Sequence, residues 1–153
     1  MGKVNWARVI LGGLIAGVVI NVCEWVANGV VMEKNWASAM QALGKPTQFT
    51  SGQLVVFNIW GFVMGIAAVW LYAAIRPRYG AGPRTAACAG LAAWFFGNLL
   101  PTVGSLVMGL FPLPLIIGGT IVGLIEIVAG TELGAWLYKE EGVAATASAA
   151  AGS

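Results

Sequence analysis

Four long apolar runs constrain this chain more than any other feature of its sequence. They extend over about residues 9–31, 53–75, 86–108 and 113–138. Each run can cross a hydrocarbon core of about 30 Å, which takes about 20 helical residues. The runs are continuously apolar and lack the alternation of a β-barrel strand, so they predict helices. The sequence therefore predicts an all-α integral membrane bundle of four transmembrane helices.

The composition agrees with a membrane environment. Apolar residues make up 59% of the 153 residues and charged residues only 9%, against roughly 25% charged residues in soluble domains. A soluble domain of this size could not bury that much apolar surface. We expect one transmembrane domain at residues 1–142. Residues 143–153 contain only Ala, Gly, Ser, Thr and Val, and we expect them to form a flexible tail.

The basic residues predict the orientation of the chain. If the chain crosses four times, six of them fall on one side and only Lys34 and Lys45 on the other. By the positive-inside rule, both termini should be cytoplasmic. We expect Arg76, Arg78 and Arg84 to contact lipid headgroups or a partner protein. The six residues on the predicted inner side are Lys3, Arg8, Arg76, Arg78, Arg84 and Lys139.

The first outer connection, residues 33–52, contains signals for a short helix. Asn35 is a candidate N-cap, and Gly44 a candidate C-terminal stop with Pro46 beyond it. Such a helix would present Trp36, Met40 and Leu43 on one face and would lie on the outer membrane surface. An ordinary solvated loop is the alternative.

Proline in the third run predicts a local distortion. Pro101 removes the hydrogen bond to the carbonyl of Gly97. Asn98 and Thr102 are close enough to satisfy the groups that this frees. The distortion could serve as a hinge or a cavity wall, or it could simply give the helix its shape.

Small residues predict where the helices touch. Glycines spaced four apart let helix backbones approach closely in lipid. We expect the packing glycines to be Gly13, Gly17, Gly61, Gly65, Gly119 and Gly123.

The two halves of the sequence also resemble each other weakly. Gly13-Leu14 and Asn21 match Gly90-Leu91 and Asn98 at one offset, and Trp70-Leu71-Tyr72 resembles Trp136-Leu137-Tyr138. A duplication of a two-helix unit, with its halves parallel, would explain these matches. Chance similarity between helices rich in Gly and Ala is the alternative.

Three acidic residues lie inside the runs, where ionised groups are costly; Glu132 is closest to the predicted inner interface and could reach headgroup water, so Glu24 and Glu126 are the two of interest. Glu24 and Glu126 have no Lys or Arg within the four runs to pair with, so we expect both to be protonated and hydrogen-bonded, or else to face water or another subunit. With Asn21, Asn58 and Asn98 they form the candidate intramembrane polar site. It could be linked to protons or cations. Alternatively, its hydrogen bonds only fix the register of the helices.

No catalytic or metal-ligating constellation is visible in the sequence. The chain has no His and no Asp, and nothing near Ser105 could activate its hydroxyl. We therefore expect a protein that is not an enzyme, with no cofactor of its own. Bound lipid, quinone or pigment is compatible with Trp25, Trp60 and Trp94. A net charge of +2 is too small to indicate a nucleic-acid partner.

Two segments resemble uncharacterised four-helix membrane proteins of bacteria. One is VWLYAAIRPRYG at residues 69–80, followed by GPRTA at 82–86. The other is ILGGLIAG at residues 10–17, with Asn21 and Glu24. The resemblance covers residues 5–140 and implies the bacterial inner (cytoplasmic) membrane. No activity is assigned to that group, so the resemblance implies no mechanism and transfers no site residues.

These features favour a non-enzymatic membrane protein. The leading interpretation is an accessory or structural subunit of a larger respiratory or photosynthetic type of assembly, or a small homo-oligomer. Its partners would be lipid, other subunits or copies of itself. The alternative is a small transporter or channel in which Glu24 and Glu126 line a proton- or cation-linked polar path.

Overall fold

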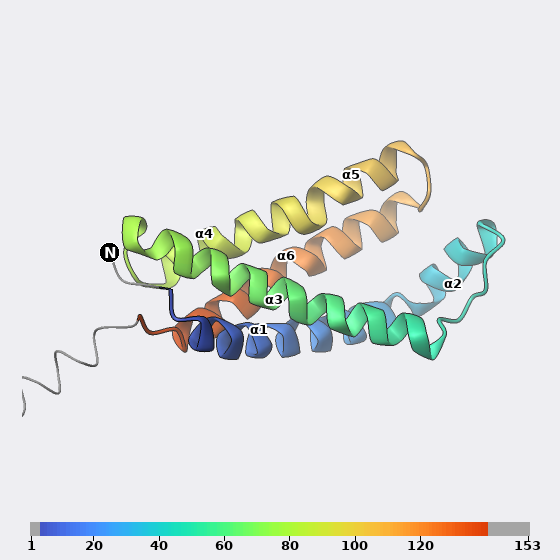
Figure 1. Cartoon of the computed structure of the whole chain (residues 1–153). Coiled ribbons are helices and arrows are strands. Elements are labelled where there is room, and N and C mark those ends of the chain that lie inside the picture. Colours follow the sequence, from blue (N-terminus) through green and yellow to red (C-terminus); the bar gives the residue numbers. More distant parts are fainter. Residues whose placement is uncertain (1–3, 141–153) are drawn as a thin grey trace, which may run out of the picture.

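The computed structural model describes residues 4–140 and contains four long helices and one short one (Figure 1). The predicted tail at 143–153 lies outside the described residues. The first span joins α1 (Trp6–Val26) to a π-helical turn, η1 (Ala27–Val31). The second is α3 (Ser51–Tyr79) and the fourth α6 (Leu113–Trp136). The third joins α4 (Pro83–Trp94), the π-helical turn η2 (Phe95–Leu99) and α5 (Leu100–Val107).

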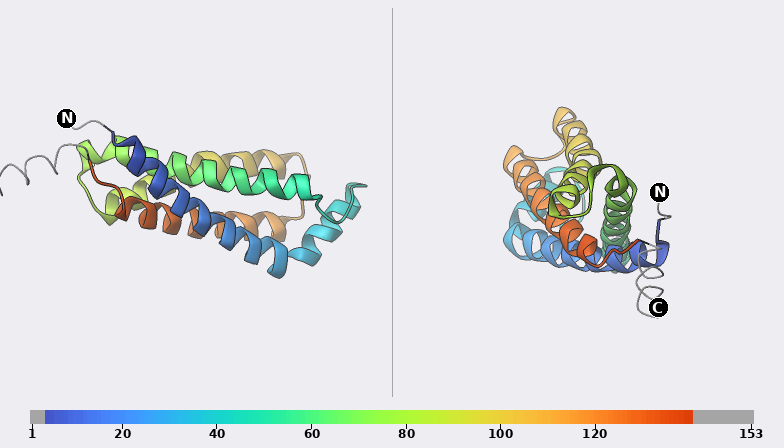
Figure 2. Two further views of the ribbon diagram at one scale, coloured as in Figure 1. Left: turned by 60° about the horizontal axis from the view of Figure 1, so that its bottom comes forward. Right: turned by 90° about the vertical axis from the view of Figure 1, so that its left-hand side faces the viewer.

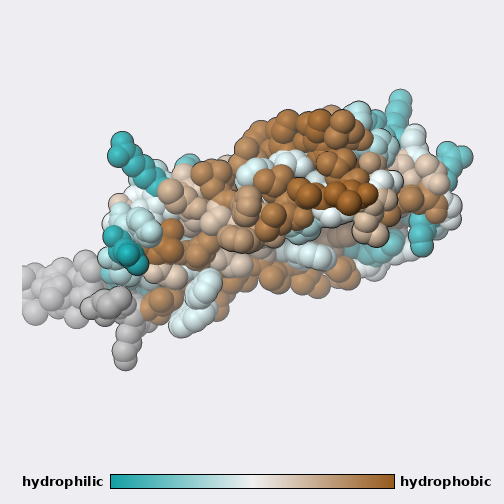
Figure 3. Space-filling model, turned by 90° about the horizontal axis from the view of Figure 1, so that it is seen from above, coloured by the Kyte–Doolittle hydropathy of each residue, from teal (hydrophilic) through white to brown (hydrophobic). Residues whose placement is uncertain are grey.

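All four spans are long and apolar enough to cross a membrane. The prediction of four candidate transmembrane helices is therefore confirmed. An apolar belt lies between two polar ends on the face shown in Figure 3. Large side chains such as Trp25, Trp60 and Phe96 are mostly exposed in the structure. Such apolar surface is stable only where lipid or another protein covers it.

The short helix α2 (Glu33–Ala42) lies in the first long connection. Its predicted start was wrong, because Met32 occupies the N-cap position and Asn35 lies inside the helix. Its end agrees with the prediction. Gly44 has a φ of +66°, and the amides of Gly44 and Lys45 donate to the carbonyls of Gln41 and Met40. This is the Schellman arrangement, which favours glycine after the last helical turn.

The helices form an antiparallel bundle in which α1 packs on α3 and α6, and α4 packs on the same two helices (Figure 2). At the end of the bundle where residues 4 and 140 lie, a core cluster of small and aromatic side chains packs the helices together. At the other end α3 diverges from α5 (Figure 1), and residues 51–60 are all exposed. The cluster consists of Val9, Tyr72, Ala73, Ala86, Ala89, Ala135 and Tyr138.

The predicted packing glycines of α1 and α3 lie against each other's helices. A Cβ on Gly13 would meet Ile66, one on Gly17 would meet Phe62, and one on Gly65 would lie 2.5 Å from the carbonyl oxygen of Gly13. Side chains at these positions would therefore separate α1 from α3.

Glycines outside that seam divide into close and open positions. Gly61 lies under the Asn21 amide and Gly123 under the Asn98 amide, whereas a Cβ on Gly119 would meet nothing within 4 Å. Another crossing joins Gly12 of α1 to Gly134 of α6, where a Cβ on Gly134 would lie 2.5 Å from the Gly12 carbonyl oxygen.

The two halves of the fold make equivalent contacts. The backbone N–H of Asn5 donates to the Tyr138 hydroxyl (3.3 Å), and the backbone N–H of Gly82 donates to the Tyr72 hydroxyl (3.4 Å). Gly82 follows Asn5 by as many residues as Asn98 follows Asn21. The two tyrosine rings meet edge to face, with centroids 6.0 Å apart. These paired contacts support the duplication that the sequence suggests.

Removing either tyrosine hydroxyl is expected to have the same small effect on stability. Tyr72→Phe and Tyr138→Phe each lose one partly buried hydrogen bond, which stabilises a fold by about 1 kcal/mol. Thermal unfolding in a mild detergent should show similar decreases for both, and no decrease for Tyr79→Phe, whose ring is exposed. A large loss for only one of the first two would contradict the equivalence.

Candidate intramembrane polar site

Two acidic side chains meet where α1 passes α6. Glu126 of α6 is buried, with 2% of its surface exposed. Its carboxyl group faces that of Glu24 on α1, within hydrogen-bonding reach. Within residues 4–140, no N–H or hydroxyl group donates a hydrogen bond to its Oε2 atom. The structure thus brings together the two acids that the sequence singled out.

A chain of polar and aromatic contacts connects this carboxyl pair to α2. Asn28 Nδ2 donates to Glu24 Oε2. Its Oδ1 accepts a 2.8 Å hydrogen bond from Trp36 Nε1 of α2. The Trp36 ring meets Phe111 in the α5–α6 connection edge to face, with centroids 5.3 Å apart. Helix α2 therefore covers the site from the open end of the bundle.

Asn98 approaches the site from the third span, within the π-helical turn η2. The turn precedes Pro101, and its wider ring is closed by the Leu100 amide, which donates to the Phe95 carbonyl. Thr102 Oγ1 donates to the Asn98 carbonyl at 2.7 Å, the bond that a threonine often makes to the residue one turn before it in a helix. Asn98 Oδ1 is buried and has no partner within the described part of the chain.

The first span contains a second π-helical turn, η1, directly after the Glu24 segment. There the Met32 amide donates to the Ala27 carbonyl at 2.8 Å. Such turns are rare, and they occur frequently at functional sites. The two turns lie on two of the helices that form the site.

A pocket of about 220 Å³ opens beside Glu24. Its polar lining comes from Glu24, Asn28, Asn98, Thr102, Ser105 and Thr120, and its remaining wall from Trp36, Phe111, Leu115, Ile116 and Gly119.

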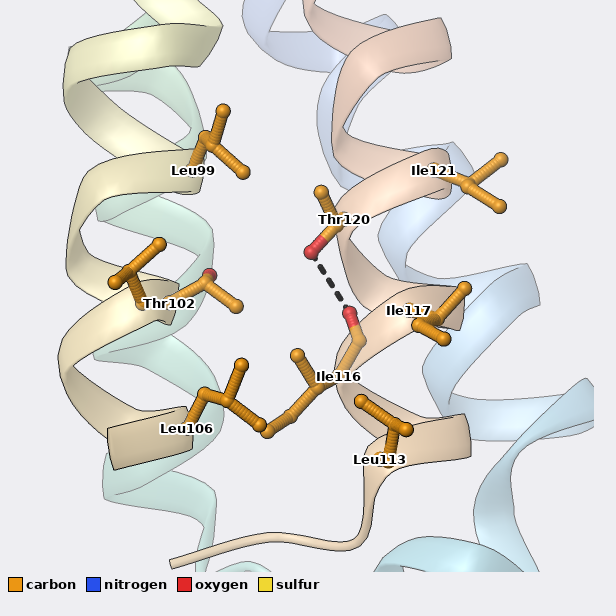
Figure 4. Close-up of a pocket in the computed structure, with 9 residues that line it drawn as sticks. Leu99, Thr102, Leu106, Leu113, Ile116, Ile117, Thr120 and Ile121 are labelled. Atoms are coloured by element: carbon orange, nitrogen blue, oxygen red, sulfur yellow. Dashed lines mark hydrogen bonds between the residues drawn. The ribbon is translucent and has the colours of Figure 1, made fainter. Parts of the chain in front are cut away.

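A second, apolar pocket of about 240 Å³ lies between α5 and α6 (Figure 4). Thr102, Ile116 and Thr120 line both pockets, so the two adjoin. The Thr120 hydroxyl donates to the Ile116 carbonyl at 2.7 Å (dashed line in Figure 4). The remaining lining is aliphatic, from both helices.

The other two predicted site asparagines do not line the pocket. Asn21 Nδ2 donates to the Gly17 carbonyl (2.9 Å) and the Asn58 carbonyl (3.1 Å). Asn58 Nδ2 donates to the Leu54 carbonyl, on the exposed side of α3. These two residues join α1 to α3.

Sequence reasoning missed most of the pocket wall. Asn28 follows Glu24 by one helical turn and so shares its face in the sequence pattern, but it was not included in the predicted site. Trp36, Ser105 and Thr120 gave no such signal.

The three predicted headgroup-contacting arginines lie at the opposite end from the pocket. Arg76 is half-buried, with Nε 3.8 Å from a carboxylate oxygen of Glu140. Its guanidinium lies over the Tyr138 ring, 5.4 Å from the centroid. Arg78 and Arg84 are exposed. Within residues 4–140, the Arg76–Glu140 contact is the one ion pair, so no cationic side chain neutralises the carboxyl pair.

The chain matches no protein-family model, no curated protein and no solved structure. The site is therefore interpreted from its own side chains.

Proposed function

We propose that the protein is a small cation-linked membrane transporter in which Glu24 and Glu126 form the binding site. One observation carries this proposal. Glu126, which is buried, faces the partly buried Glu24 without a cationic partner among residues 4–140, and Glu24 lines a pocket inside a bundle of four candidate membrane spans. The site residues make the transporter interpretation stronger than the subunit interpretation that the composition favoured.

Two facing carboxyl groups in a low-dielectric interior are not both ionised at low cost. A pair that shares one proton carries a single negative charge. A cation that enters the pocket can stabilise the second charge and displace that proton. The Cys23 thiol of α1 also lies close enough to both acids to interact with them electrostatically. Exchange of a proton for another cation at one site would couple their movements.

The closed half of the bundle favours a transporter over an open channel. Ala16, Ala68 and Val69 are fully buried, and Gly12 meets Gly134 at backbone distance. No route for an ion is apparent through such packing, so transport requires a second conformation in which this half opens. The π-helical turns η1 and η2 are the segments where α1 and the third span can change shape most easily.

The charges at the two ends provide the proposed orientation. Five basic residues of the described chain lie at the closed end or next to it, while Lys34 and Lys45 flank α2. With both termini cytoplasmic, in a bacterial inner membrane, the pocket would open to the outside. Helix α2 would lie at the outer membrane surface. The five are Arg8, Arg76, Arg78, Arg84 and Lys139.

A second candidate function is that of a structural subunit or homo-oligomer. Residues 51–60 of α3 are exposed on all sides, although they include the polar side chain of Asn58. A neighbouring protein or second copy could cover this segment and accept hydrogen bonds from it. This interpretation gives the carboxyl pair only the task of fixing helix register.

Charge movement on a solid-supported membrane separates the two functions. Proteoliposomes receive concentration jumps of protons, Na⁺, K⁺ and organic ammonium ions in turn. At least one of these should produce a current in the wild type, and Glu126→Gln should abolish it. Glu132→Gln is the matched control, because Glu132 lies on the same helix but is exposed.

Absence of any current that depends on Glu126 would overturn the transporter proposal. Stable co-migration of the protein with a much larger membrane complex, together with that absence, would favour the subunit.

A further inference from the structure

We propose that the ligand of this site is an amphipathic organic ammonium ion, a protonated amine that carries an apolar group. Its charged head would occupy the polar pocket beside Glu24, and its apolar part would lie between α5 and α6. This inference rests on the proposed cation-linked function and adds the chemical class of the cation.

The size of the polar pocket is the first argument. A volume of about 220 Å³ corresponds to several water molecules, since one occupies about 30 Å³ in the liquid. A bare monovalent ion would fill little of it. A divalent ion would lack ligands, because Ca²⁺ takes six to eight oxygens. Within residues 4–140, no three His, Cys, Asp or Glu side chains cluster.

The unpartnered atoms of the site are the second argument. Asn98 Oδ1 is a buried acceptor without a donor among the described residues, and Glu126 Oε2 receives no hydrogen bond there from an N–H or hydroxyl group, although the facing Glu24 carboxyl can share a proton with it. Leaving such acceptors unpaired is costly. Asn98 lines the pocket itself, and Glu126 lies behind Glu24, which does. A ligand that brings several N–H donors and a positive charge would satisfy them, and a protonated amine has both.

The rest of the wall suits an organic cation better than a hydrated one. Trp36 and Phe111 line the same pocket, and aromatic rings attract ammonium groups. The Asn28 side chain is engaged at both ends, by Glu24 and by Trp36, so it offers little to a water shell.

The adjoining apolar pocket provides room for the remainder of the ligand. Thr102 and Thr120 lie on the boundary, and each hydroxyl already donates to a carbonyl of its own helix. These two hydroxyl groups therefore need no water molecule as a hydrogen-bond acceptor at the boundary between the pockets. Beyond it, Leu106, Leu113 and Ile117 present aliphatic surface (Figure 4). A cationic head and an alkyl or aryl tail match this sequence of polar and apolar walls.

Calorimetric titration of the lipid-free protein in a non-ionic detergent tests the class of ligand. Hexylammonium should bind, whereas 1-hexanol, which has the same tail and no charge, should not. Methylammonium should bind at least tenfold more weakly than hexylammonium, because each buried methylene strengthens binding by up to about fourfold. Equal binding of hexylammonium and 1-hexanol would overturn the inference.

A cavity-filling variant locates the binding site. Gly119→Leu should occupy the polar pocket and weaken hexylammonium binding at least tenfold. Gly104→Leu is the matched control, since Gly104 lines neither pocket. A Cβ meets nothing within 4 Å at either glycine, so both variants should fold. Unchanged binding to the folded Gly119→Leu variant would also overturn the inference.

The ammonium group could belong to a soluble amine or to a lipid headgroup. Nanodiscs with phosphatidylethanolamine are compared with nanodiscs that contain only phosphatidylglycerol. Suppression of hexylammonium binding by phosphatidylethanolamine alone identifies the lipid as occupant, and equal binding in both identifies a soluble amine. Suppression in both would contradict the proposed pocket.

Failure of this inference differs from failure of the proposed function. If Na⁺, K⁺ or protons give a current that depends on Glu126 but hexylammonium does not bind, the transporter remains and the amine is excluded. If nothing gives such a current, the transporter proposal fails as well.

Discussion

Replacing Gly134 with leucine is expected to prevent the protein from forming a stable bundle. A Cβ at this position would lie 2.5 Å from the Gly12 carbonyl oxygen and 2.6 Å from Val69 Cγ2. The first obstacle is backbone, which no rotamer change can move. The cost should reach or exceed the roughly 1–3 kcal/mol of ordinary overpacking. Fluorescence-detected size-exclusion chromatography after mild heating should show no monodisperse peak for the variant.

The control for this experiment is Gly104→Leu, also a glycine inside a candidate span. A Cβ there meets nothing within 4 Å, so the helix should tolerate the side chain and gain helix propensity. Retention of a wild-type elution profile by Gly134→Leu would mean that α1 and α6 do not cross at backbone distance. The arrangement of the four helices would then need revision.

Replacing Glu126 with leucine is expected to abolish the cation response while leaving the bundle as stable as the wild type, or more so. The wild-type carboxyl is buried, and no N–H or hydroxyl group of the described chain donates to its Oε2 atom. A buried polar group of this kind is costly, and an apolar side chain of similar volume removes the cost. Residues kept for function often reduce stability in this way.

Thermal unfolding and solid-supported-membrane currents, measured on the same preparation, check this expectation. Glu126→Gln keeps the shape of the side chain and should lose the current as well. A decrease of several degrees in unfolding temperature for Glu126→Leu, with the current preserved, would support the register-fixing role instead. Glu24→Leu is expected to give a smaller gain in stability, because Glu24 is only partly buried and Asn28 donates to it.

The four candidate spans could be predicted from sequence because their length is dictated by the lipid and not by details of packing. The same holds for the glycines of α1 and α3, since only small residues allow close approach in lipid. Helix boundaries were less accurate. α3 continues through Pro77 to Tyr79, beyond the predicted end near residue 75.

The candidate site was predictable only in part. Glu24 and Glu126 were singled out because an acid without a cationic partner is rare inside a membrane, and they do meet. Asn21 and Asn58 were grouped with them by residue type, although they lie on the α1–α3 seam. The helix that each asparagine faces depends on how its own helix is rotated about its axis. A helix that is apolar on all sides gives no sequence signal for that rotation.

The contribution of Trp36 could not be predicted, since it depends on a tertiary contact between α2 and α1. The π-helical turns were also invisible, because each requires only one extra residue per turn and leaves no periodic signature. Pro101 indicated that a distortion would occur. It did not indicate that the preceding turn would take the π form and carry Asn98.

We infer that the polar pocket carries negative charge and can be reached from the α2 end of the bundle but not from the opposite end. A cysteine placed in the pocket tests this inference most directly, as Ser105→Cys in a chain whose Cys23 and Cys88 are replaced by alanine. Ser105 lines the polar pocket. Membrane-impermeant thiol reagents that differ only in charge are then applied to each side of oriented proteoliposomes. We expect labelling from the α2 side alone, faster for the cationic reagent and slowed by hexylammonium. Equal labelling from both sides, or faster labelling by the anionic reagent, would contradict it.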